Sequence, residues 1–176
     1  MTFKTAFLFL CCCAVTGVQA ASEVLSYQEQ VIVAGGERRV VRIPVGYRLE
    51  LLTDKLDGPR MLTFAANGDL FIGSRSGQVY RLPPPYTTPT VPVTLSGYPH
   101  SVAVRGADIL IARTNGLYQA PYKPGQGRLA PETLKLLAAL PDSGGHSSRS
   151  VAVGTDGALY FTSDSDTQGL FRLRRI

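Results

Sequence analysis

The chain has two histidines, and His146 lies in a segment of small residues, "GGHSSR", three positions before Arg149. An imidazole titrates near neutral pH, so it can take a proton from a reacting hydroxyl group. A guanidinium pairs with a carboxylate through two parallel hydrogen bonds. The two side chains together therefore suit proton transfer beside an anionic ligand. A histidine in a Gly/Ser segment is equally well explained as a solvated loop residue.

The elements that must position these side chains form an internal repeat. "PRMLTFAANGDLFIGSRSGQVYRL" begins at Pro59, "PHSVAVRGADILIARTNGLYQAPY" at Pro99 and "SRSVAVGTDGALYFTSDSDTQGLFRL" at Ser148. Each copy opens with a short alternating strand, continues through a turn into a second apolar strand, and ends in a third strand. The turns contain Asn67-Gly68, Gly106-Ala107 and Asp156-Gly157. Asn-Gly and Asp-Gly supply the positive φ angles that two-residue hairpin turns require.

The period of the repeat predicts an all-β propeller built from four-stranded antiparallel blades. Phe64 and Val104 are 40 positions apart, and Val104 and Val153 are 49 apart. Repeats of about 40–50 residues made of short strands are typical of propeller blades. The only helix-like stretch, residues 130–140, also fits an outer strand. We therefore expect about three blades over residues 44–176, with residues 21–43 adding an outer strand to a blade.

The repeat places Arg60, His100 and Arg149 in the same position, immediately before or at the start of the first strand of each blade. That strand lies nearest the central axis of a propeller, so the three side chains are expected at one end of the axial channel. A cavity that collects these groups favours an anionic ligand with several oxygens. The simpler alternatives are that the arginines bond loop carbonyls and that His100 is a turn residue.

Three blades do not close a ring, because propellers have about four to eight blades. The first and last sheets then have open edges, which favour association between chains. We expect Leu62, Val102 and Val151 to lack the neighbouring blades that would bury them. The chain is expected to be part of a larger ring or a truncated remnant.

Residues 1–20, "MTFKTAFLFLCCCAVTGVQA", have the features of a cleaved secretory signal. A single lysine precedes an apolar run too short to span a bilayer, and a small-x-small cleavage site ends at Ala20. We therefore expect secretion or export to the periplasm, without stable membrane insertion. Cleavage removes all three cysteines, so the mature chain contains neither an internal disulfide nor a thiolate metal site.

Charge argues against a nucleic-acid partner. The net charge of +5 falls to +4 with the loss of Lys4, and the remaining basic residues are scattered without interleaved aromatic residues. That pattern is typical of an ordinary solvated surface.

Residues 44–168 resemble the soluble quinoprotein glucose/sorbosone dehydrogenases. The resemblance rests on "KLDGPRMLTFAANGDLFIGSRSGQVYRL", on "PY-x-PGQ" and on "LPDSGGHSSRSVAVGTDGALYF", the combination being more specific than any one hairpin. It implies a six-bladed propeller that oxidises a sugar with pyrroloquinoline quinone (PQQ) and calcium, passing electrons to an acceptor that the sequence does not name. His146 would take the proton from the sugar C1 hydroxyl as hydride passes to the quinone. Arg149 would hold the cofactor or the loop, Gln168 would contact the quinone, and Arg60 and His100 would contribute cofactor contacts.

The chain departs from the family in three respects. "FTSDSD" lacks the glycine that usually follows the third repeat's second strand, and Gly145 stands where some members carry an aspartate that orients the base. The later blades, which supply the calcium carbonyls and further cofactor contacts, are missing. We therefore expect the three-blade chain to bind neither quinone nor calcium tightly. Asp164 and Asp166 suggest a calcium loop, but the EF-hand spacing and its distal glutamate are absent.

Two other functions remain open. A metal-dependent hydrolase of the gluconolactonase or strictosidine-synthase type would require Glu, Asn and Asp at the positions that Arg60, His100 and Arg149 occupy. A non-catalytic propeller module would need no titratable group in the channel.

Overall fold

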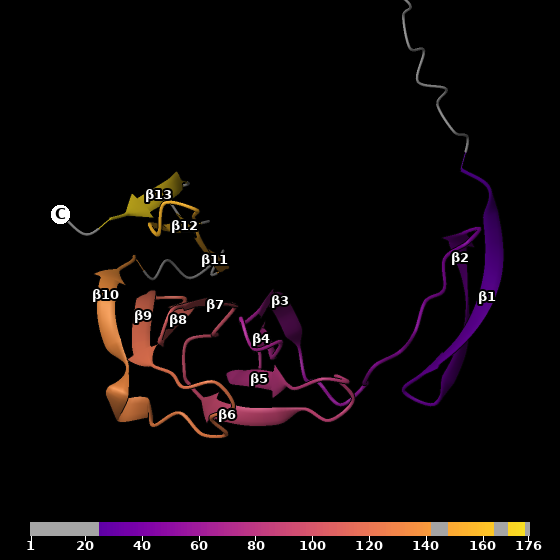
Figure 1. Cartoon of the computed structure of the whole chain (residues 1–176), viewed down its shortest axis with the longest axis horizontal. Coiled ribbons are helices and arrows are strands. Elements are labelled where there is room, and N and C mark those ends of the chain that lie inside the picture. Colours follow the sequence, from indigo (N-terminus) through magenta and orange to yellow (C-terminus); the bar gives the residue numbers. More distant parts are fainter. Residues whose placement is uncertain (1–24, 142–147, 164–168, 175–176) are drawn as a thin grey trace, which may run out of the picture.

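The computed structural model describes residues 25–141, 148–163 and 169–174 of the 176-residue chain (Figure 1). The secondary structure of these ranges is β strand, except for one 3-10 turn at Pro131–Thr133. The all-β prediction is therefore confirmed. Within the described ranges, no helix is both long and apolar enough to cross a membrane. The expected signal segment, residues 1–20, lies outside the described residues.

Eleven described strands form three antiparallel sheets whose order follows the chain. The strands of blade 1 are β3 (Pro59–Phe64), β4 (Leu70–Ser74), β5 (Gln78–Leu82) and β6 (Thr90–Thr94). Those of blade 2 are β7 (Ser101–Arg105), β8 (Asp108–Arg113), β9 (Gly116–Pro121) and β10 (Lys135–Ala139). Those of blade 3 are β11 (Arg149–Val153), β12 (Leu159–Ser163) and β13 (Gly169–Leu173). The helix-like stretch at 130–140 thus contains an outer strand.

The first strands of the three blades lie side by side, as they do around a propeller axis (Figure 1). The Met61 amide of β3 donates a hydrogen bond of 3.1 Å to the carbonyl of His100, directly before β7. The Ser101 hydroxyl of β7 accepts one of 3.1 Å from the Val151 amide of β11. The structure is therefore a partial propeller, as the repeat predicts.

Two core clusters of the described residues fill the spaces between blades, because alternate residues of each strand face opposite sides of its sheet. A third, around Leu70 and Leu82, covers the other face of blade 1. On β8, Ile109 and Ile111 pack against Phe71 of blade 1. Leu110, between them, packs against Leu159 of blade 3. Blade 2 is thus buried on both faces, and the four residues between the ends of β8, Ile109 to Ala112, are apolar and buried.

The prediction of exposure at the open edges is correct for blade 1 and wrong for the other two blades. Leu62 of β3 is 60% exposed, but Val102 is 2% and Val151 8% exposed at the same position of the repeat. Val102 packs in the core between blades 1 and 2, and Val151 in the core between blades 2 and 3. These positions face the preceding blade, so only the first copy lacks a neighbour.

The glycines of the turns have the predicted positive φ angles, but the expected two-residue connection is found in blade 2 alone of the three described blades. Gly68, Gly106 and Gly157 have φ angles of +84°, +58° and +73°. Only blade 2 has a two-residue connection between its first two strands, whereas five residues connect them in blades 1 and 3. In blade 3, the Asp156 carboxylate accepts a hydrogen bond of 3.0 Å from the Ala158 amide, which stabilises the longer loop.

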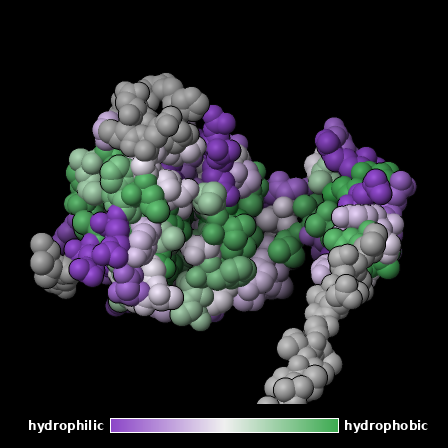
Figure 2. Space-filling view, turned by 90° about the horizontal axis from the view of Figure 1, so that it is seen from above, coloured by the Kyte–Doolittle hydropathy of each residue, from purple (hydrophilic) through white to green (hydrophobic). Residues whose placement is uncertain are grey.

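The N-terminal segment forms a hairpin of β1 (Tyr27–Ala34) and β2 (Glu37–Pro44). The two strands pair along their whole length and form a sheet of their own, so in this structure neither is an outer strand of the three blades, contrary to the expectation from the sequence. Gly35 and Gly36, at φ angles of +58° and +78°, form the turn that lets adjacent strands pair locally. Figure 2 shows the hairpin as a separate lobe beside the blades.

Candidate functional site

The structure brings Arg60, His100 and Arg149 to the same end of the first strands. Arg60 is the second residue of β3, His100 directly precedes β7, and Arg149 is the first residue of β11. The first strands of the blades lie side by side, so the three positions share one end of the channel. This arrangement agrees with the one expected from the repeat.

His100 is held in the interface between blades 1 and 2. Its amide donates a hydrogen bond of 3.1 Å to the carbonyl of Ala112, and the Tyr98 ring meets the imidazole edge-on with ring centroids 5.9 Å apart. A Cβ at Gly73 of β4 would overlap the carbonyl oxygens of Pro99 and His100. The absence of a side chain at Gly73 is therefore what lets the His100 backbone pack against blade 1.

The imidazole of His100 is only 4% exposed, and its Nε2 is buried without a hydrogen-bond partner among the described residues. Burial and the positive charges of Arg60, Arg75 and Arg149 hold the pKa of His100 below its ordinary value of 6.5. The imidazole is accordingly neutral at neutral pH.

Arg75 joins this group without having been expected from the sequence. It lies in the turn between β4 and β5, and its amide donates a hydrogen bond of 2.9 Å to the carbonyl of Gly58, just before β3. Because β4 runs antiparallel to β3, that turn returns to the end where β3 begins. The antiparallel order of the strands, which the sequence predicts, could have placed Arg75 at this end of the blade.

Arg149 is buried and bonds main-chain carbonyls on both sides of residues 142–147. Its Nη1 donates to the carbonyl of Ser148 at 2.9 Å, and its Nη2 donates to that of Pro141 at 3.0 Å. The guanidinium therefore ties together the two ends of the segment that carries His146. Bonds to loop carbonyls are the simpler of the alternatives considered for Arg149, and a contact with a cofactor stays a prediction.

His146 and Gln168 lie outside the described residues, as do Asp164 and Asp166. Their expected roles remain predictions. In the described part of the chain, no three His, Cys, Asp or Glu residues lie close enough together to hold a metal ion.

A second polar cluster, missed in the sequence, is built around Asp69, which precedes β4. Its carboxylate accepts hydrogen bonds from Arg81 Nε at 2.6 Å and Nη2 at 2.9 Å. The Tyr122 hydroxyl of blade 2 donates a third of 3.0 Å, and the Asn67 amide a fourth of 2.7 Å. Asp69 lies where the third repeat has Ala158, and this departure from the repeat could have marked Asp69 as a polar residue with a specific partner.

The carboxylate of Asp69 is stabilised in its charged form. Burial alone would raise its pKa, but the hydrogen bonds from Arg81, Asn67 and Tyr122 and the charge of Arg81 hold the pKa below its ordinary value. Burial, followed by the bond to Asp69, raises the pKa of the Tyr122 hydroxyl. The cluster joins blades 1 and 2 at the opposite end of the first strands from His100, so its position favours a structural role.

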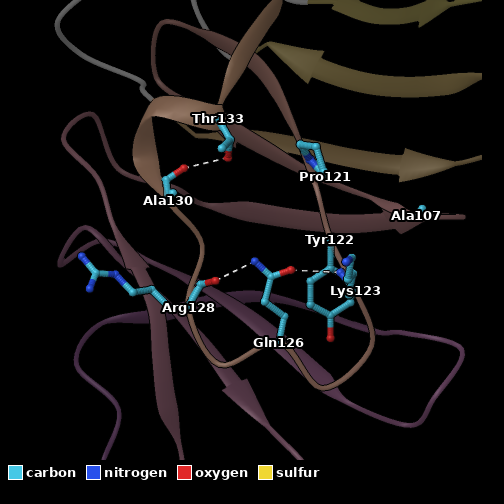
Figure 3. Close-up of a pocket in the computed structure, with 8 residues that line it drawn as sticks. All are labelled: Ala107, Pro121, Tyr122, Lys123, Gln126, Arg128, Ala130 and Thr133. Atoms are coloured by element: carbon cyan, nitrogen blue, oxygen red, sulfur yellow. Dashed lines mark hydrogen bonds between the residues drawn. The ribbon is translucent and has the colours of Figure 1, made fainter.

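The motif "PY-x-PGQ" shapes a separate cavity of about 430 Å³ beside blade 2 (Figure 3). Gln126 spans the loop between β9 and β10. Its side chain accepts a hydrogen bond of 3.0 Å from the Lys123 amide and donates one of 2.6 Å to the carbonyl of Arg128. The cavity is lined by Tyr122, near the Asp69 end of the blades, so this motif does not contribute to the His100 end of the channel.

The fold is a partial propeller in which Arg60, His100 and Arg149 lie at one end of the first strands. No protein-family model matches the chain, and no curated protein matches it. Solved structures do match. The calcium structure of a Trichoderma reesei carbohydrate-active enzyme of family AA12 superposes with a TM-score of 0.56 and 16% identity, covering 79% of this chain and 33% of the other.

Two further structures belong to proteins described as dehydrogenases. The holo form of the PQQ domain of pyranose dehydrogenase from Coprinopsis cinerea has a TM-score of 0.56 and 18% identity, over 64% of this chain and 29% of that domain. A putative oxidoreductase (glucose dehydrogenase) from Thermus thermophilus has a TM-score of 0.52 and 24% identity, over 66% and 40%. The chain thus spans 29–40% of the structures it matches, and the resemblance expected from the sequence is confirmed as a likeness of fold.

Proposed function

We propose that this chain is part of a sugar oxidoreductase that uses PQQ as its cofactor. The observation that carries the proposal is the group of basic side chains at one end of the first strands. There the positive charges of Arg60, Arg75 and Arg149 act on the buried imidazole of His100. The three matched structures, all of oxidoreductases or carbohydrate-active enzymes, support it.

The residues present fit a cofactor that carries three carboxylates. Arg60 and Arg75 are exposed and form no ion pair with a carboxylate of the described chain. They would pair with carboxylates of the ligand, and their charges suit its anionic form. When bound, PQQ supplies the two-electron acceptor for oxidation of a sugar hydroxyl.

The protein's own contribution is to orient the sugar and to remove a proton. His146 would accept the proton of the sugar C1 hydroxyl, a role that comes from the family resemblance. Arg149 acts as a positioning residue, because its bonds to Pro141 and Ser148 anchor both ends of the segment around His146. Gln168 would contact the quinone.

Calcium and export complete the proposal. The calcium ligands are expected mostly outside this chain, in later blades, and we derive no step from the ion. The signal segment at residues 1–20 directs the protein to the periplasm or the extracellular space. The small-molecule partner is a sugar, and no nucleic-acid partner is expected.

The metal-dependent hydrolase is the less suitable alternative. Its metal would require Glu, Asn and Asp on the first strands, where this chain has Arg60, His100 and Arg149. The positive charges of Arg60 and Arg149 at that end repel a divalent cation.

Equilibrium dialysis of PQQ against the chain tests the cofactor site. We expect weak but saturable binding, because this chain supplies only some of the contacts. Arg60→Gln/Arg75→Gln should lower the affinity by about 10²–10⁴-fold, since each bond to a charged group contributes about 1.5–3 kcal/mol. Arg105→Gln is the matched control, because Arg105 ends β7 at the opposite end from His100. The absence of saturable binding, or equal losses in the double variant and the control, would contradict the proposal.

A further inference from the structure

His100 has an unusual combination of burial and missing partners. Its Nε2 is buried and makes no hydrogen bond within the described residues, although nearly all buried polar atoms in proteins are paired. A group left in this state weakens the fold unless a ligand or another element compensates for it. The imidazole therefore requires an explanation beyond packing.

Within the described ranges, the charged groups that act on His100 are cationic. Arg60 of β3, Arg75 of the β4–β5 turn and Arg149 of β11 act on it as positive charges, and the ring of Tyr98 contacts it from its own loop. These four described residues come from blade 1, from blade 3 and from the segment before β7. The ion pairs of the described residues involve other arginines, so no described carboxylate pairs with Arg60 or Arg75.

Burial and the positive charges of the arginines both disfavour a protonated imidazole. A bound anion would offset the effect of the positive charges. A ligand with several carboxylates, bound beside Arg60 and Arg75, would cancel the field that these guanidiniums exert on His100. The imidazole would then gain a proton from solvent, while no bond in the ligand is made or broken. Linkage requires the reverse as well, so protonation of His100 must strengthen ligand binding.

We propose that His100 takes up a proton when a polycarboxylate binds beside Arg60 and Arg75, so that the affinity for the ligand rises as the pH falls through the neutral range. The inference rests on the proposed function in taking PQQ as the physiological ligand, but the mechanism holds for any polycarboxylate. His100 is in this sense a proton-linked specificity residue, which favours a highly charged anion over a neutral sugar or a monocarboxylate.

The test follows the two histidines of the chain by NMR, since their ring signals report protonation directly. The full chain is titrated at pH 7.0 with benzene-1,3,5-tricarboxylate and, separately, with PQQ. His146→Ala assigns the two ring signals. We expect the His100 signal to move toward its protonated position on binding, and the affinity for either ligand to rise by about two- to tenfold between pH 8.0 and 6.0, one proton at most being linked.

Two variants separate this role from a structural one. His100→Gln should still bind the tricarboxylate at pH 8.0, but with an affinity that no longer changes with pH. Arg105→Gln should keep both the affinity and its pH dependence. Circular dichroism shows that each variant is folded, and His100→Asn replaces His100→Gln if the latter is not.

The outcomes distinguish this inference from the proposed function. Binding of PQQ without any change in the His100 signal, or pH-dependent binding that persists in His100→Gln, would overturn the inference and leave the cofactor site standing. Proton uptake with the tricarboxylate but no binding of PQQ would support the inference and contradict the proposed cofactor. If neither ligand binds, both are wrong.

Discussion

The Tyr122 hydroxyl of blade 2 donates a hydrogen bond of 3.0 Å to the buried carboxylate of Asp69 in blade 1, 53 positions earlier in the chain. The same carboxylate is held by two bonds from Arg81 within its own blade. Asp69 therefore pairs with Arg81 within blade 1 and also binds blade 2 through Tyr122. This hydrogen bond fixes the relative position of two blades whose other packing contacts are apolar.

Tyr122→Phe should lower the free energy of unfolding by about 0.5–1.5 kcal/mol, the usual contribution of one hydrogen bond. Asp69→Ala should cost about 3–5 kcal/mol, because it leaves the largely buried guanidinium of Arg81 without its partner. Urea unfolding measures both, with Tyr47→Phe, at an exposed tyrosine, as the control. Equal midpoints for Tyr122→Phe and Tyr47→Phe would show that the bond between blades does not stabilise the fold.

Gly73→Ala should destabilise the chain by about 1–3 kcal/mol, the usual cost of forcing extra atoms into a packed region. The new methyl group would overlap the backbone oxygens of Pro99 and His100, which cannot move without parting blades 1 and 2. Gly127→Ala is the matched control, since a Cβ there meets nothing within 4 Å. Thermal melts of the two variants should differ by several degrees, and identical melts would argue against the close approach at Gly73.

His100 should make stability depend on pH near neutrality. Its pKa is lowered in the folded chain, chiefly by burial and then by the three arginines, so below about pH 6.5 the unfolded chain binds more protons than the folded one. The free energy of unfolding is therefore expected to fall as the pH drops through 6.5, and His100→Gln should remove that part of the loss. Urea midpoints at several pH values check this, with His146→Ala as the histidine control. Parallel pH profiles for the wild type and His100→Gln would count against it.

His146→Ala should reduce turnover by about 10²–10⁴-fold in the sugar-oxidising protein that contains this chain, the usual contribution of a positioned base. PQQ binding should change far less, because the imidazole acts on the sugar hydroxyl rather than on the cofactor. A dye-linked assay with an aldose measures the first quantity and equilibrium dialysis the second. Near-normal turnover in the variant would rule His146 out as the base.

The exposed apolar residues of β3 should cause the mature chain, residues 21–176, to self-associate. Leu62 and Phe64 are 60% and 58% exposed, and burial contributes about 25 cal/mol for each Å² of apolar surface. Size-exclusion chromatography with light scattering should show an oligomer that dissociates in Leu62→Thr/Phe64→Ser but persists in Val91→Thr, a change on the outer strand β6. A monomeric wild-type chain would contradict the expectation, and tight quinone binding by that monomer would show that three blades suffice for the site.

The sequence by itself determined the blades and their turns. Alternating apolar residues and Gly-containing turns are local signals, and the 40- and 49-residue spacings set how often they recur, so strand order and the shared position of Arg60, His100 and Arg149 could be predicted. The family resemblance of the motifs pointed to the same fold. It also supplied roles for His146 and Gln168, which lie outside the described residues and remain predictions.

Only the tertiary structure decided which of these positions are buried and what the polar groups bond. Leu62, Val102 and Val151 are equivalent in the repeat, but they differ in exposure because burial depends on the sheet that lies alongside. Arg75 acts on His100 because the β4–β5 turn lies at the end where β3 begins. Tyr122 of blade 2 bonds Asp69 of the neighbouring blade 1. Such contacts join residues far apart in the chain, and a local pattern carries no information about them. The hairpin of β1 and β2 is a different case, because the Gly35-Gly36 turn is a local signal for it.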